Sequence, residues 1–136
     1  MIGGTADRAS GHASLLESLL RAAMIVDKKR HGEHTVLRIE GVVRIGESAE
    51  FLAQALGKLL ADERGHVFVD LERINYIDST GIGELVGYFG RFRDQGRRLV
   101  LVHPAPRIRK LLEIAKLDDV FPTYDSLESA LASEGG

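Results

Sequence analysis

The chain has 136 residues, 44% hydrophobic and 28% charged, and its 18 basic and 20 acidic residues give a net charge of −2. This balance gives no reason to expect direct binding of nucleic acid. The absence of cysteine excludes disulfides, thiolate catalysis and thiolate metal sites. No apolar run approaches the ~18 residues of a membrane helix, and the start of the chain lacks the pattern of a secretory signal. We therefore expect a cytoplasmic protein without membrane insertion.

Residues 1–23 predict a flexible or partly helical N-terminal extension. Residues 1–12 are small and polar, which is typical of disorder. Residues 13–23 fit a short helix with four leucines on one side, Leu15, Leu16, Leu19 and Leu20. Such a segment is open to two roles, a cap on the folded part or the contact of a homodimer.

From Met24 onward the sequence alternates between strand and helix patterns. In chain order we expect strands over residues 24–29 and 35–40, a helix from 48 or 49 to 61, a strand over 67–71, a helix over 79–94, a strand over 99–102, a helix over 106–115, a short edge strand within 120–124 and a helix over 126–133. The order ββαβαβαβα predicts a single α/β domain over residues 24–133. Its sheet should be mixed but mostly parallel, with about four helices covering it.

The segment Asp78-Ser79-Thr80-Gly81 stands between an apolar strand and an amphipathic helix. The first backbone N–H groups of a helix have no partner within it, and the helix dipole is positive at that end. A hydroxyl residue there suits an anion such as phosphate. Ser79 is therefore a candidate switch, and Asp78 is a candidate N-cap.

Three catalytic or nucleotide-binding interpretations of this segment have little support. An aspartic protease needs a second carboxylate segment, and the chain has none. The glycines complete neither G-x-G-x-x-G nor a Walker motif, and G-x-S-x-G is absent. His103 follows the strand over 99–102, so a Ser79–His103 pair at one edge of the sheet stays conceivable. We expect no catalytic residue and no cofactor.

Other features have mainly structural interpretations. Gly83, Gly87 and Gly90 form one flank of the predicted helix, which fits tight packing against a neighbouring element or, alternatively, a docking surface for a partner. The basic runs are interpreted as solvated helix faces, Arg91, Arg93, Arg97 and Arg98 in one and Arg107, Arg109 and Lys110 in the other. The five histidines lack ligand spacing, so no metal site is expected.

The segment Val67-Phe68-Val69-Asp70-Leu71, followed by Ile77-Asp78-Ser79-Thr80-Gly81-Ile82-Gly83, resembles the signature of STAS domains of the anti-sigma factor antagonist type. Gly96, the strand over 99–102, Pro106 and the ending Leu117-Asp118-Asp119-Val120-Phe121-Pro122 also match. The resemblance covers roughly residues 24–132 and implies a single STAS-like domain.

The resemblance implies a non-enzymatic protein that works by partner switching. Its partner would be an anti-sigma factor that is also a serine kinase. That kinase would phosphorylate Ser79, rather than the adjacent Thr80, and a PP2C-type phosphatase would reverse the reaction. The implied partner surface comprises Asp78, Ser79, Thr80, Gly81 and Gly83.

One residue departs from the family pattern. The second strand is commonly followed by a Gly-x-Leu-Asp type segment whose aspartate belongs to the partner surface, whereas this chain has Gly41-Val42-Val43-Arg44. The charge reversal at Arg44 implies a partner of complementary charge or a different partner. An alternative function is therefore a constitutive STAS scaffold or a subunit associated with a transporter.

Overall fold

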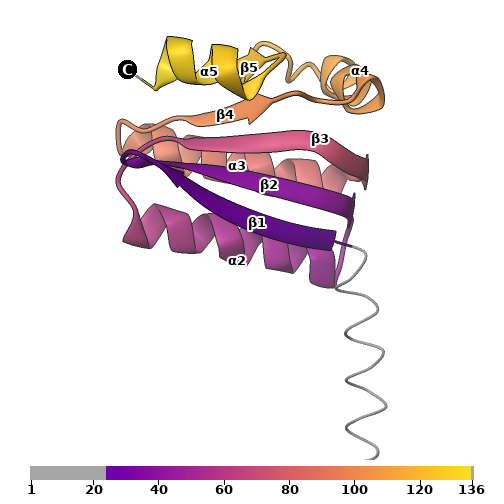
Figure 1. The fold of residues 1–136 in the computed structure, drawn as a ribbon. Helices are drawn as coiled ribbons and strands as arrows, with labels where there is room; N and C mark the ends of the chain where they lie inside the picture. Colours follow the sequence, from indigo (N-terminus) through magenta and orange to yellow (C-terminus); the bar gives the residue numbers. More distant parts are fainter. Residues whose placement is uncertain (1–23, 136) are drawn as a thin grey trace, which may run out of the picture.

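The structure is a computed structural model that describes residues 24–135 (Figure 1). The helix expected over residues 13–23 lies outside the described residues. None of the helices within residues 24–135 is long and apolar enough to cross a membrane.

Strands and helices follow in the predicted order ββαβαβαβα. Their bounds are β1 (Met24–His31), β2 (His34–Val43), α2 (Glu47–Asp62), β3 (Val67–Ile77), α3 (Ser79–Asp94), β4 (Leu99–Val102), α4 (Pro106–Ile114), β5 (Thr123–Tyr124) and α5 (Leu127–Glu134). Two elements, α3 and β4, begin and end at the predicted residues. The first two strands are longer than predicted. Their hairpin turns through only Gly32 and Glu33, so β1 runs to His31 and β2 begins at His34, while at its other end β2 continues to Val43. Gly32 has a positive φ of 66° that a non-glycine residue rarely adopts.

The five strands form one sheet in the order β1-β2-β3-β4-β5. The β1–β2 pair is antiparallel and the other three pairs are parallel. This confirms the predicted mixed, mostly parallel sheet. At one edge β5 has only two residues, directly after Pro122, which cannot donate a hydrogen bond to a ladder.

One face of the sheet packs against α2 and α3, which lie side by side behind it in Figure 1. Alternate strand residues point to this face, among them the buried Leu37, Val69 and Leu101. They meet Leu56 of α2 and Leu85 of α3 in the main hydrophobic core. In α2 the buried residues Leu52, Leu56 and Leu59 recur at helical spacing and form the stripe that faces the sheet.

The other face of the sheet is only partly covered. Phe68 and Val100 point to it and pack with Ala130 of α5 in a second, smaller core. Toward β1 and β2 the same face is polar, and Arg38 Nε lies 3.5 Å from a carboxylate oxygen of Asp70. Both faces of the sheet are thus covered at the starts of β2 and β3 and along β4, where Val36, Phe68, Val100 and Val102 pack with α5.

Strand β3 is much longer than the predicted 67–71. Its last pair with β4 joins Asp70 to Val102, and beyond that point β3 continues beside β2 alone as far as Ile77. Two irregularities in the β2–β3 register accompany this extension. The predicted strand ends at residue 71 because the apolar run ends there, and the residues after it show no regular alternation of apolar and polar side chains.

Helix α3 ends where Gly96 turns the chain with a φ of 72°, as its position in the sequence predicts. The next residue corrects a prediction, because Arg97 is 7% exposed and is not part of a solvated basic run. Its guanidinium donates to the carbonyl oxygens of Leu59, Leu60 and Gly65 at 2.9–3.1 Å. Arg97 thereby fastens the end of α2 and the following loop to the end of α3.

Candidate functional site

Helix α3 begins at a capped end. Asp78 is the N-cap residue, with extended backbone angles, and its Oδ1 accepts a hydrogen bond from the Gly81 N–H at 3.0 Å. This bond satisfies one of the N–H groups that a helix leaves unpaired at its first turn. The capping role expected for Asp78 is therefore present in the structure.

The same carboxylate fixes the loop between β2 and α2. Asp78 Oδ2 accepts a hydrogen bond from the Ile45 N–H at 2.8 Å, and the Asp78 N–H donates to the Val43 carbonyl at 3.0 Å. Burial acts to raise the pKa of the Asp78 carboxyl, but the N–H groups of Gly81 and Ile45 outweigh it and hold the pKa below its ordinary value. A fixed, ionised carboxylate thus stands directly before Ser79.

Ser79 is the first residue of α3, and its side chain is exposed. Among the described residues its hydroxyl has no hydrogen-bond partner. Thr80 is the second residue of the helix and is partly buried. Of the two adjacent hydroxyls, Ser79 is the one presented more fully to a protein approaching this end of the sheet.

Gly81 and Gly83 occupy different surroundings although both were predicted for the partner surface. Gly81 is buried, and a Cβ placed on it would lie 2.7 Å from Ile77 Cγ1 and 2.8 Å from Val43 Cγ1. Gly83 is exposed, and nothing lies within 4 Å of the equivalent position. Gly81 lets the first turn of α3 sit against the sheet, and Gly83 leaves backbone open to solvent.

The glycine flank of α3 does not pack tightly against another element, so that interpretation is wrong for all three of its members. Added Cβ atoms at Gly83 and Gly87 meet nothing within 4 Å, and at Gly90 the only such neighbour is the end of the Arg93 side chain at 3.8 Å. No other described element covers this flank. A smooth strip of helix backbone therefore continues from Ser79 along α3.

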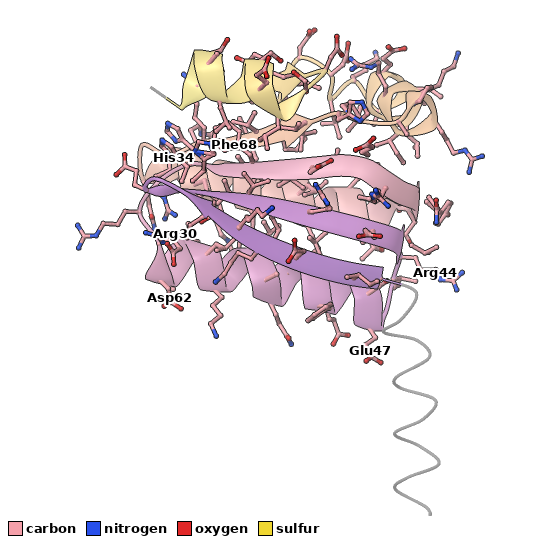
Figure 2. The ribbon with its side chains drawn as sticks, viewed as in Figure 1. Arg30, His34, Arg44, Glu47, Asp62 and Phe68 are labelled. Carbon is pink, nitrogen blue, oxygen red and sulfur yellow. The ribbon has the colours of Figure 1, made fainter. Side chains whose placement is uncertain are left out.

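The loop after β2 joins the site, as the register of β2 and β3 requires. Arg44 follows Val43 directly and is exposed, and its backbone is held by Ser48, whose hydroxyl both accepts from the Arg44 N–H and donates to its carbonyl. Figure 2 shows the Arg44 side chain extending away from the ribbon at the end of the sheet. The structure therefore places Arg44 beside Asp78 and Ser79, although 34 residues separate it from Asp78.

Two exposed apolar residues at this end of the sheet were not predicted. Ile45 is 74% exposed in the loop fixed by Asp78, and Tyr76 is 46% exposed on β3, where it pairs with Val42. Large apolar side chains this exposed next to a polar site are typical of protein interfaces. A lone isoleucine in the polar stretch Arg44-Ile45-Gly46 was the available sequence signal.

The structure excludes the Ser79–His103 pair. His103 follows the end of β4, opposite the middle of β3, and its Nδ1 lies 3.7 Å from a carboxylate oxygen of Glu72. Ser79 comes after the far end of β3, on the order of 20 Å farther along the strand. The expectation that both lie at one edge was wrong because β3 extends well past β4.

Comparison with known proteins identifies the family. A family model for the STAS domain matches residues 26–130. The anti-sigma-B factor antagonist of Bacillus subtilis (strain 168) is 31% identical over 111 residues, which cover 82% of this chain and 94% of the relative.

Solved structures agree on the fold. An anti-sigma factor antagonist from Mycobacterium paratuberculosis superposes with a TM-score of 0.74 at 23% identity, covering 83% of this chain and 95% of that one. The anti-sigma factor antagonist SpoIIAA in its unphosphorylated form gives a TM-score of 0.69 at 18% identity, covering 82% and 98% of the two chains. The chain belongs to the STAS domain family, among its anti-sigma factor antagonists.

Proposed function

We propose that this protein binds an anti-sigma factor kinase in the cytoplasm while Ser79 is unphosphorylated and releases it once the kinase has phosphorylated Ser79. A PP2C-type phosphatase restores the binding form. The observation that carries the proposal is the exposed Ser79 hydroxyl, which has no partner among the described residues and opens helix α3 directly after its cap. Such a hydroxyl is accessible both to a binding partner and to a kinase.

The folded chain tolerates a phosphate at this position better than an interface would. A phosphoserine carries about −1.5 to −2 charges at pH 7, and the first turn of a helix stabilises negative charge. Within a complex the same phosphate would lie against the ionised Asp78 and would need to be desolvated. Phosphorylation therefore weakens binding without unfolding the protein.

The surface around Ser79 fits a protein partner. Ile45 supplies an exposed apolar contact, and the uncovered backbone at Gly83 and Gly87 allows close approach along α3. Arg44 adds a positive charge to the same end of the sheet, so the partner carries an acidic group opposite it. Loss of about 3 kcal/mol of binding on phosphorylation would lower the affinity more than a hundredfold.

The relatives support a phosphorylation switch. The Bacillus subtilis relative is named for antagonism of an anti-sigma factor. SpoIIAA, described as a Bacillus cell fate determinant, has been solved in a phosphorylated form that superposes on this chain with a TM-score of 0.65 at 19% identity, covering 80% of this chain and 98% of that one. The chain carries its own serine at the capped start of α3, where such a modification would act.

The test is a paired capture from lysate of the host with the wild-type chain and the Ser79→Asp variant as baits, read by mass spectrometry. We expect an ATP-binding anti-sigma factor kinase with the wild type and with Ser79→Ala, and its loss with Ser79→Asp. Gln54→Glu serves as the charge control, because Gln54 is exposed on α2 and the change adds one negative charge away from Ser79. Mass spectrometry of the purified chain should locate phosphate on Ser79 and not on Thr80.

Retention of the kinase by a folded Ser79→Asp variant would refute the proposal. Equal capture of scaffold or transporter subunits by all baits would support the alternative, a constitutive STAS module. Arg44 is the residue that favours this alternative, because it departs from the family pattern in the partner surface. The Arg44→Asp variant then distinguishes the two, since a carboxylate facing the acidic group of the kinase should weaken capture of that kinase.

A further inference from the structure

Two histidines are stacked at the end of the sheet opposite Ser79. His34 is the first residue of β2 and His66 directly precedes β3. Their ring centroids are 4.9 Å apart, and the planes differ by 8°. Phe68 meets the His34 ring edge-on at 5.9 Å, and Figure 2 shows these two side chains together at this end. Both histidine rings are partly buried.

The hydrogen bonds of His34 define its neutral tautomer. Its Nδ1 accepts from the His66 N–H at 2.9 Å. Its Nε2 lies 3.1 Å from the carbonyl oxygen of Gly135, which can only accept, so Nε2 carries the proton. Gly65 packs directly on this ring, since a Cβ on Gly65 would lie 2.6 Å from His34 Nδ1. His34 thus connects the start of β2 to the residue before β3 and to the end of α5.

His66 extends the connection to the next strand. Its Nδ1 accepts from the Arg98 N–H at 3.0 Å, just before β4 begins. Backbone bonds run beside it, from the Thr35 N–H to the His66 carbonyl at 3.1 Å and from the Val67 N–H to the Arg98 carbonyl at 2.9 Å. The two rings together therefore connect the starts of β2, β3 and β4 to the last turn of α5.

Protonation is incompatible with this arrangement. Each Nδ1 accepts from a backbone N–H, and a proton added to Nδ1 would point at that N–H and break the bond. Two stacked imidazolium rings would also repel each other. The neutral rings hold the network together, and acid disrupts it at two points at once.

The charges around the pair both raise and lower the pKa of His66. Burial, the His34 ring and the Arg98 guanidinium lower the pKa of His66, while Glu134 and Glu33 act to raise it. Arg98 and Glu134 also pair with each other, with 3.3 Å between Arg98 Nη1 and a Glu134 oxygen. The lowering effects dominate, so His66 is neutral at pH 7.

We propose that His34 and His66 form a pH-sensitive latch, closed when both rings are neutral and opened by their protonation, that holds the end of α5 and the strand starts together. The direction of the pH dependence follows from the hydrogen bonds that the neutral rings make. Because the pKa of His66 is lowered in the closed form, the open form binds more protons at this ring, and acidification below its ordinary pKa of about 6.5 favours the open form. The latch is independent of the proposed switch, which lies at the other end of the sheet.

The test is NMR on the full chain. Nitrogen-15 shifts of the imidazoles should show the Nε2–H tautomer of His34 at about pH 7.5. Protection of the Arg98 and His66 amides, corrected for intrinsic exchange, should fall roughly tenfold or more between about pH 7.5 and about pH 5.5. The Val69 amide, where β3 pairs with both β2 and β4, should keep its protection.

Matched variants separate the latch from general acid sensitivity. In His66→Asn the side-chain oxygen takes the place of Nδ1 as an acceptor but cannot be protonated, so Arg98 amide protection should become independent of pH. His103→Asn removes an exposed histidine outside the latch and should behave as the wild type. Unchanged wild-type protection across this pH range, an Nδ1–H tautomer at His34, or equal pH dependence in a folded His66→Asn variant would overturn the proposal. The wild-type readings decide the matter if that variant does not fold.

Discussion

Replacement of Gly81 by alanine should destabilise the protein, whereas the same replacement at Gly87, in the same helix, should stabilise it. At Gly81 the new methyl group would lie 2.7 Å from Ile77 Cγ1 and 2.8 Å from Val43 Cγ1. Ile77 is 3% exposed and Val43 is fully buried, so neither side chain can move into solvent. At Gly87 the methyl group would meet nothing within 4 Å.

The two magnitudes follow from competing terms. Alanine is favoured over glycine inside a helix by roughly 0.5–1 kcal/mol, which is the full expected gain for Gly87→Ala. Overpacking of a core by one carbon costs about 1–3 kcal/mol, so Gly81→Ala should lose about 1–2 kcal/mol net. The two variants should therefore differ by about 1.5–3 kcal/mol in free energy of unfolding.

Urea unfolding of the full chain, followed by far-ultraviolet circular dichroism, measures both values against the wild type. A rise in the midpoint for Gly87→Ala together with a fall for Gly81→Ala is the expected result. A Gly81→Ala protein as stable as the wild type would refute the packing argument. It would mean that the first turn of α3 can move away from β2 and β3 at little cost.

Two further predictions concern polar side chains that bind backbone groups of distant elements. The Asp78→Ala substitution should lower the free energy of unfolding by about 1–2 kcal/mol at neutral pH, because the N–H groups of Gly81 and Ile45 lose their acceptor. Since the pKa of this carboxyl is lowered by folding, its contribution is present above the ordinary pKa of about 3.9 and is lost as the pH falls through the folded value. The difference in free energy of unfolding between the wild type and Asp78→Ala, measured in urea, should therefore be smaller in acid than at pH 7. A difference that does not change with pH would contradict this. The Arg97→Met substitution should lower the free energy of unfolding by about 3 kcal/mol, because three carbonyl groups lose their donor. The control Arg91→Met, at an exposed position, should lower it by under about 1 kcal/mol in the same assay. Equal losses would argue against the role of Arg97.

Much of the fold could be predicted because its signals are local. Helix α3 has a capping aspartate before it and a glycine after it, and β4 is a short apolar run between polar residues, so both were predicted to the residue. The length of β3 could not be predicted from periodicity, because the apolar run ends at Leu71 and the irregular register leaves no regular alternation after it. That error also produced the wrong placement of His103 beside Ser79.

Contacts across the sheet explain the other differences. The sequence indicates a glycine flank on α3, but it contains no signal that no element of the domain would cover Gly83 and Gly87. In the sequence Arg97 looks like part of a basic run. The carbonyl groups that bind it belong to residues far away in the chain, so nothing near Arg97 indicates its burial. The pairing of His34 with His66 depends on the parallel alignment of β2 and β3, and the spacing of the two residues does not indicate it.

The outer edge of β1 determines whether a strand of another molecule can pair with this sheet. Within the described residues no strand lies beyond β1, and its middle carries Asp27, Lys28, Lys29 and Arg30, all exposed. Two copies that joined antiparallel with this edge centred on Lys28 and Lys29 would set lysines opposite lysines, which is unfavourable. Charged edge strands of this kind protect proteins from joining sheet to sheet and from aggregating. A cell can therefore accumulate this protein without the exposed edge turning into a template for fibres.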